Sequence, residues 1–173
     1  LDDDLDGFTV AAWICPDAST TGDRRIFSTY MPGTFTAEGW GVGINGPTGD
    51  VLLGTAFGRL DYTSSTAIFP ALGEWHHVAY VYRGNPVNQV EFFLDGVSVG
   101  LTTTASATEG MIDTALPFAI GGIGIDGNPQ SFFGKIDDLR IYRVELEAAD
   151  ILEVSQAVGG GELAIFALNH SGS

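Results

Sequence analysis

The sequence predicts an all-β protein of two antiparallel sheets packed as a sandwich, with one short C-terminal helix and a C-terminal extension strand. Three observations predict this class. Apolar and polar residues alternate with a period of two through many short segments, as in half-buried strands. The 24 glycines lie between these segments and indicate many tight turns. The 173 residues, 45% of them hydrophobic, suit one domain with a sizeable core.

The expected strands follow one another from the N-terminus. The first covers residues 8–15, where Phe8, Val10, Ala12 and Ile14 share one face. The others are expected at 25–30, 39–45, 50–57, 66–69, 74–83, 88–95, 96–104, 117–121 and 132–142. Asp95-Gly96, between two of these runs, predicts a type I′ hairpin turn, which needs positive φ at both residues. Some ten short strands with such turns are typical of a jelly roll.

A single helix is expected, over residues 145–157, which carry good helix formers and a rough apolar face. Three glycines at 159–161 end it. Residues 162–168 then form another β-like run, apolar on both faces. The predicted organisation is a sandwich over 1–157, a glycine hinge over 158–161 and an extension strand over 162–173.

The charge is strongly negative, with 22 acidic and 7 basic residues and a formal net charge of −15. Nucleic acid is excluded as a partner, because its phosphates require a basic surface. No apolar stretch reaches the length of a membrane span, so membrane insertion is not expected. An acidic surface favours solubility outside cells and attracts divalent cations. Cys15 is the single cysteine and is expected to be a small buried residue without an intrachain disulfide.

Four blocks of sequence carry a family resemblance: Phe8 to Pro16 (FTVAAWICP), Gly73 to Ala79 (GEWHHVA), Phe93 to Gly96 (FLDG) and Gly134 to Tyr142 (GKIDDLRIY). Together, and in this order, they resemble the laminin G-like, concanavalin A-like (lectin and glucanase) domains of secreted bacterial proteins. The resemblance implies two antiparallel sheets packed face to face and an extracellular or cell-surface location. It also implies roles that range over sugar binding, adhesion and architectural spacing, so it does not select one function.

An enzyme is not predicted. Glucan hydrolases of this shape present acidic residues at alternate positions of one strand, and glycoside hydrolysis needs two carboxyl groups close together. Here Glu145 and Glu147 fall in the expected helix, and Glu91 has no acidic partner nearby along its strand. The histidines have no nucleophile elbow near them. No catalytic residue is therefore assigned.

Two neighbouring histidines lie in the strand expected at 74–83. His76 and His77 point to opposite faces, because side chains alternate along a strand, so they cannot bind one metal ion together. The resemblance places both in the structural core and makes Trp75 a packing anchor.

A calcium ion is the cofactor that the resemblance suggests. Related domains hold a structural Ca²⁺ through an aspartate in the matching last strand, here Asp137, with Asp138 as the weaker candidate, and through carbonyls of a first strand that this sequence lacks. Carboxylate and carbonyl oxygens are the ligands Ca²⁺ prefers. The alternative is that both aspartates are rim carboxylates. Weaker calcium candidates are the acidic segments at 126–128 and at 2–6.

The sequence gives weaker signals for sugar contacts and for glycosylation. Tyr30, Trp40, Tyr62 and Phe69 are candidates for stacking on sugar rings, although sandwich cores also use aromatic residues. Asn169 stands in an Asn-x-Ser sequon, a weak prediction of N-glycosylation.

The C-terminal run suggests the main functional hypothesis. It supplies a strand that would fill the place of the absent first strand, through Leu163, Ile165, Phe166 and Leu168. If it inserts into its own sandwich, the protein is a monomer; if it inserts into the next copy, copies link head to tail into a filament. The sequence thus predicts a non-catalytic extracellular structural or adhesive module that binds copies of itself. The alternative is a calcium-assisted, lectin-like module that binds extracellular polysaccharide.

Overall fold

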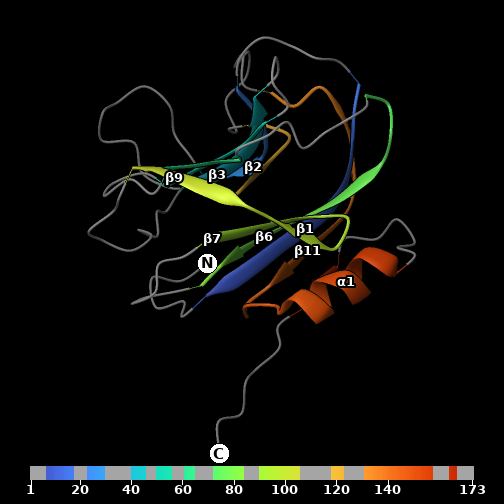
Figure 1. The fold of residues 1–173 in the computed structure, drawn as a ribbon. Coiled ribbons are helices and arrows are strands. Elements are labelled where there is room, and N and C mark those ends of the chain that lie inside the picture. The colour runs from blue at the N-terminus through green and yellow to red at the C-terminus, as the bar shows by residue number, and fades with distance from the viewer. Residues whose placement is uncertain are drawn as a thin grey trace, which may run out of the picture. The chain divides into compact units, whose positions relative to one another are not determined.

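The structure is a computed structural model that describes residues 7–17, 23–29, 40–45, 50–55, 61–64, 72–83, 90–105, 118–122, 131–157 and 164–166. Its strands are β1 (Phe8–Pro16), β2 (Asp23–Ser28), β3 (Trp40–Asn45), β4 (Asp50–Thr55), β5 (Asp61–Ser64), β6 (His76–Tyr82), β7 (Val90–Leu94), β8 (Val97–Val99), β9 (Leu101–Ala105), β10 (Ala119–Ile120), β11 (Gly134–Tyr142) and β12 (Ala164–Phe166). The helix is α1 (Ala148–Gln156) (Figure 1).

The strands form two sheets, in the orders β12-β11-β1-β6-β7-β8 and β10-β2-β3-β4-β5-β9. Pairing is antiparallel from β1 through β6 and β7 to β8 and throughout the second sheet. The predicted class, two antiparallel sheets with one short helix, is confirmed. No helix in the described ranges is long and apolar enough to cross a membrane.

The chain divides into two compact units. The first comprises Leu1–Ile14, His76–Val99 and Asp137–Ser173, and it contains α1. The second comprises Cys15–Trp75 and Gly100–Ile136.

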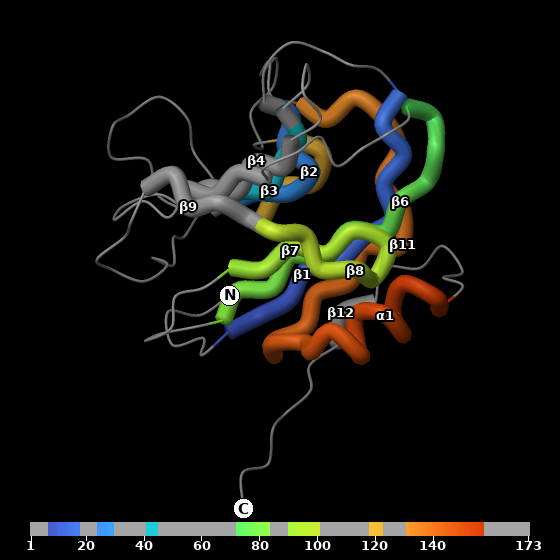
Figure 2. The backbone as a smooth tube through the Cα atoms, viewed as in Figure 1, coloured from blue at the N-terminus to red at the C-terminus, as the bar shows by residue number. Residues whose placement is uncertain are grey.

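In the first unit, α1 covers one face of the sheet (Figures 1 and 2). Ala11 of β1 and Ala79 of β6 lie opposite each other in register, and both are fully buried. Their small side chains leave room for Ile151 of α1, which is also fully buried in the same cluster. The alternating positions of β1 face the other side, where the Phe8 ring lies 5.8 Å from that of Tyr80. Both faces of β1 are therefore packed, which explains why its sequence is apolar almost throughout.

The helix begins three residues later than the sequence predicts. Glu147 has an extended backbone and is the N-cap, and its side chain and that of Asp150 form a reciprocal capping box. The backbone N–H of Glu147 donates to the Asp150 carboxylate at 3.1 Å. Glu145 and Glu147 thus precede the helix, because a carboxylate at this position satisfies amide groups that the first turn leaves open.

Two strand predictions need correction. The run expected at 96–104 is two strands, β8 and β9, that belong to different sheets and are separated at Gly100. A run of β-favouring residues does not by itself show where a chain leaves one sheet for another. The strand β5 was not predicted, and the strand expected at 66–69 lies outside the described residues.

The hairpin between β7 and β8 has the predicted backbone. Asp95 has φ 50° and Gly96 has φ 80°, so both central residues are in the left-handed region that a type I′ turn requires.

Part of the C-terminal run is a strand of its own chain. β12 pairs in parallel with β11, with Ile165 opposite Ile141, at the edge of the first sheet. This is the arrangement within one molecule, and strand donation to the next copy stays a prediction. Residues 162–163 and 167–173 lie outside the described residues, and the side chains of β12 are not described. The burial of Leu163, Ile165, Phe166 and Leu168 therefore stays a prediction.

Candidate functional site

Two loops flank the C-terminal end of β1, one on each side, within the second unit. The N–H of Gly73 donates to the Pro16 carbonyl at 2.7 Å, and the N–H of Asp17 donates to the Phe133 carbonyl at 3.0 Å. The segment before β6 and the segment before β11 are therefore held on opposite sides of Pro16-Asp17. From two strand spacings, they lie roughly 10 Å apart.

Both segments expose large apolar side chains. Leu72 is 51% exposed, Trp75 is 44% exposed and Phe133 is 49% exposed. We call these three residues, two of them aromatic and one a leucine, the aromatic surface. Trp75 is thus not the packing anchor that the resemblance implied; it stands one residue before the buried strand β6, where the chain is still outside the sheet. Aromatic rings left half exposed are typical of binding surfaces.

Basic side chains border the aromatic surface at its Phe133 end. The guanidinium of Arg24 lies over the Phe133 ring, 4.8 Å from the ring centre. The backbone of Arg25, the next residue of β2, forms an isolated β-bridge with Ser131, but its side chain lies against Gly41 and its Nε is buried. The Lys135 ammonium lies 3.5 Å from an Asp17 carboxylate oxygen, and both side chains are more than half exposed. The geometry offers flat apolar faces beside charged hydrogen-bonding groups.

The two histidines lie in the core, as predicted, with His76 8% and His77 2% exposed. Both are tied to the β7–β8 hairpin through Asp95: His76 Nδ1 lies 2.9 Å from one carboxylate oxygen, and the His77 N–H donates to the other at 2.8 Å. The His77 ring packs edge-on against Trp13, with ring centres 5.6 Å apart. Burial lowers the pKa of His77 to about 4, so its ring is neutral at pH 7.

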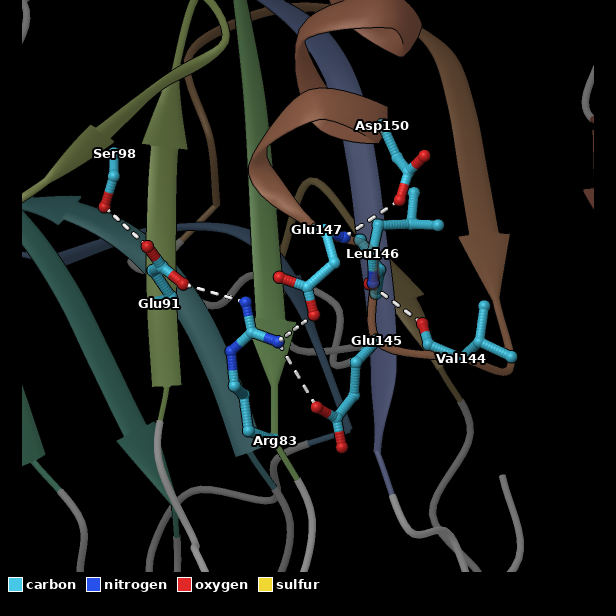
Figure 3. Close-up of polar contacts among 9 residues, drawn as sticks. Arg83, Glu91, Ser98, Val144, Glu145, Leu146, Glu147 and Asp150 are labelled. Carbon is cyan, nitrogen blue, oxygen red and sulfur yellow. Dashed lines mark hydrogen bonds and ion pairs between the residues drawn. The ribbon is translucent and has the colours of Figure 1, made fainter.

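An acidic cluster surrounds Arg83 (Figure 3). Its guanidinium lies 3.0 Å from Glu91, 3.3 Å from Glu145 and 3.1 Å from Glu147. As expected, Glu91 has no acidic neighbour along its own strand; the carboxylates that share Arg83 with it come from the segment before α1. One guanidinium engages all three carboxylates, so the cluster joins β6 and β7 to the start of α1.

The aspartates of β11 have different surroundings. Asp138 has φ 47°, and its two carboxylate oxygens accept hydrogen bonds from Arg140 Nε at 2.9 Å and Nη2 at 2.7 Å. These hydrogen bonds raise the pKa of Arg140. Asp137 is exposed and accepts a hydrogen bond from the Asp138 N–H at 2.8 Å.

Within the part of the chain that the structure describes, no group of three or more His, Cys, Asp or Glu side chains is placed to hold a metal ion. Calcium at Asp137 stays a prediction, since carbonyl ligands would have to complete it. Asp138 is the poorer ligand because Arg140 already occupies its carboxylate. The acidic segments at 126–128 and 2–6 lie outside the described residues.

The structure describes only some of the other residues that the sequence analysis singled out. Cys15 is buried, as expected. Trp40 lies in β3 and Tyr62 in β5, but the structure does not describe their side chains. Tyr30, Phe69 and Asn169 lie outside the described residues. Sequence reasoning missed Trp75 and Phe133 as surface residues; the available signal was that each directly precedes an expected strand.

Comparison with known proteins agrees with this fold. The carbohydrate-binding module CBM40 of the Ruminococcus gnavus IT-sialidase, solved with α2,3-sialyllactose, has a TM-score of 0.66 at 16% identity, over 87% of this chain and 83% of that one. Domain 4 of an extracellular arabinanase from Geobacillus stearothermophilus, solved with arabinotriose, has a TM-score of 0.60 at 22% identity, over 87% and 67%.

A putative carbohydrate binding protein from Bacteroides ovatus ATCC 8483 has a TM-score of 0.64 at 18% identity over 86% of this chain, which spans only 40% of that protein. These likenesses show the fold, a jelly-roll sandwich. No curated protein matches the sequence. Residues 1–152 match the family described as the concanavalin A-like lectin/glucanases superfamily. The chain therefore belongs to the concanavalin A-like lectin/glucanases superfamily.

Proposed function

We propose that the protein is a non-catalytic, extracellular carbohydrate-binding module. The observation that carries the proposal is the aromatic surface, on which Trp75 and Phe133 remain about half exposed on either side of Pro16-Asp17. A sugar ring has an apolar face of C–H groups and a rim of hydroxyls. It fits a surface that combines aromatic rings with charged hydrogen-bonding groups at their edge.

The spacing of the two rings supports binding of a chain of sugars. Their segments lie two strand spacings apart, roughly 10 Å, so the contact with a sugar chain can be shared between the two rings. Backbone hydrogen bonds to Pro16 and Asp17 position both segments, which lowers the entropy cost of binding. Two of the structural neighbours were solved with oligosaccharides bound, which supports the same class of ligand.

Filament assembly by strand donation has less support. The strand that would be donated, β12, pairs with β11 of its own chain. Two of the neighbours are described as a carbohydrate-binding module and a putative carbohydrate binding protein, and the arabinanase domain was solved with arabinotriose, which favours the carbohydrate hypothesis over self-assembly.

The experiment is a glycan array followed by titration calorimetry with the strongest oligosaccharide. We expect Trp75→Ala and Phe133→Ala each to weaken binding at least tenfold, since each removes a stacking face. Val97→Ala is the matched control, because Val97 is 67% exposed but lies in the β7–β8 hairpin of the other unit, and it should leave binding unchanged. Unchanged affinity in both aromatic variants, or no glycan bound at all, would contradict the proposal.

A further inference from the structure

We infer that the aromatic surface takes a neutral oligosaccharide and that Asp17, between its two segments, is the residue that recognises the sugar hydroxyls. This inference rests on the proposed function, and it names the sugar class and the specificity-determining residue of the same site. It is carried by the place of the Asp17 carboxylate, by its exposure and by the charges around it.

Asp17 lies in the middle of the aromatic surface. The N–H of Gly73, two residues before Trp75, donates to the Pro16 carbonyl at 2.7 Å. The Asp17 N–H donates to the Phe133 carbonyl at 3.0 Å. Asp17 is therefore about one strand spacing, roughly 5 Å, from each of the two segments that carry an aromatic ring. A sugar chain that reaches from one ring to the other passes this residue.

The Asp17 carboxylate is accessible to a ligand. Its side chain is 52% exposed. Within the described residues its one partner is the Lys135 ammonium, which lies 3.5 Å from Oδ1. An exposed ion pair of this length is weak, so the carboxylate can accept hydrogen bonds from a sugar while the pair persists. Lys135 follows Phe133 by two residues, and the pair thus draws the carboxylate toward the segment of that ring.

A carboxylate between two aromatic rings suits a neutral sugar. Stacking covers the apolar face of the sugar ring and leaves its hydroxyls at the edge. Neighbouring hydroxyls can donate to the two oxygens of one carboxylate, and hydrogen bonds to an ionised acceptor are stronger than those between neutral groups. The Lys135 ammonium beside Asp17 supplies a donor for an oxygen of the same sugar.

The charges around the surface disfavour an acidic sugar. The exposed Glu74 lies in one of the two segments, in a chain of net charge −15. The described basic residues of the second unit are Arg24, Arg25 and Lys135, and all three are already engaged. A sugar carboxylate would therefore be repelled by Asp17 and Glu74, with no unengaged cation among these residues to balance it.

The test begins with the glycan array, on which the most strongly bound glycans are expected to be neutral. Titration calorimetry on the whole chain then compares oligosaccharides that differ only in a hydroxymethyl or carboxylate group on each sugar. The pairs are mannotetraose with tetramannuronate, galactotetraose with tetragalacturonate and cellotetraose with tetraglucuronate. For the backbone that binds, we expect the neutral member to bind at least about tenfold more tightly than the acidic member.

Asp17→Asn assigns the recognition to the carboxylate, because it keeps the size of the side chain and removes the charge. We expect the variant to weaken the neutral probe at least about tenfold and to reduce the preference over the acidic probe. Glu153→Gln is the matched control: it removes one exposed carboxylate from α1 in the first unit and should keep both affinity and preference.

Lys135→Gln separates the carboxylate from its partner. If Asp17 recognises the ligand, loss of the neighbouring positive charge should enlarge the preference for the neutral probe. A smaller preference would assign recognition to the ammonium and overturn the inference. Because Lys135 is 64% exposed, the substitution is not expected to disturb folding, and equal melting temperatures check this.

Failure of the inference can be told apart from failure of the proposed function. If the strongest array glycans are acidic, if the acidic probes bind as tightly as the neutral ones, or if Asp17→Asn keeps either the affinity or the preference, the inference is overturned. The proposed function then still stands, because a glycan is bound. If no array glycan and no probe binds, the proposed function falls as well.

Discussion

His77 is a buried imidazole with no hydrogen-bond partner for its Nδ1 atom. Burial, assisted by the charge of Arg140, outweighs the carboxylates of Asp95 and Asp138 and lowers its pKa from 6.5 to about 4. Between these two values the unfolded chain binds a proton on this ring that the folded chain does not. Stability is therefore fully present above about pH 6.5 and is lost as the pH falls toward 4.

The size of this effect is testable with His77→Gln, which does not titrate. A depression of the pKa from 6.5 to about 4 corresponds to about 3 kcal/mol. Wild type should lose about that much more unfolding free energy than the variant between pH 7 and pH 4, as measured by urea denaturation. Equal losses in the two proteins would show that His77 does not control acid stability.

Thr9 anchors the segment before α1 through one buried hydroxyl. Its Oγ1 donates to the Val144 carbonyl and accepts from the Leu146 N–H, both at 2.9 Å. Thr9→Val keeps the shape but leaves two backbone groups without partners, so we expect a loss of about 2 kcal/mol in denaturant unfolding. Ser98→Ala is the control, because its exposed bond to Glu91 should contribute less than about 0.5 kcal/mol. Equal effects of the two changes would refute the anchoring role.

At the scale of elements, the β7–β8 hairpin depends on Gly96 for two separate reasons. Its φ of 80° disfavours any side chain, and an added Cβ would press on Leu152 and Ser155 of α1. Gly73 has φ 81° with nothing nearby, and Gly100 has neither constraint. Substitution by alanine should cost about 1 kcal/mol at Gly73, close to zero at Gly100, and at least about 2 kcal/mol at Gly96. Thermal unfolding of the three variants checks this order. If Gly96→Ala lowered the stability no more than Gly73→Ala, α1 would not touch the turn.

Local patterns were enough to predict many elements. Period-two alternation located β1 and β6, and the Asp95-Gly96 pair predicted its turn because positive φ is a local property of those residues. The division of residues 96–104 between two sheets was not predictable, since it depends on pairing partners far away in sequence. The start of α1 was misplaced for a related reason: Glu147 is a good helix former that the capping box with Asp150 keeps outside the helix.

At the scale of the molecule, the functional surface was harder to predict than the fold. The family resemblance gave the sandwich, and the family match over residues 1–152 confirms it. The same resemblance assigned Trp75 to the core, whereas its exposure follows from its position just beyond the strand end. The grouping of Arg24, Lys135 and Phe133 joins distant segments through β1, so no local pattern could show it.

The calcium hypothesis makes its own prediction for the whole molecule. If Asp137 helps to hold a structural ion, removal of calcium by EDTA lowers the melting temperature, and Asp137→Ala abolishes that sensitivity. Asp137 is exposed, so the substitution itself should cost little. A melting temperature that responds neither to EDTA nor to the variant would leave Asp137 as a rim carboxylate.

The central claim is that sugars bind on the aromatic surface, and tryptophan indole N–H signals in a two-dimensional NMR spectrum test it most directly. The chain has 3 tryptophans, so each indole can be assigned by single substitution to phenylalanine. Trp75 is 44% exposed on the proposed surface, whereas Trp13 packs against His77 in the other unit. On titration with the tightest-binding oligosaccharide, the account predicts that the Trp75 signal moves in a saturable way while the Trp13 signal stays. A saturable shift of Trp13 with Trp75 unmoved would contradict it.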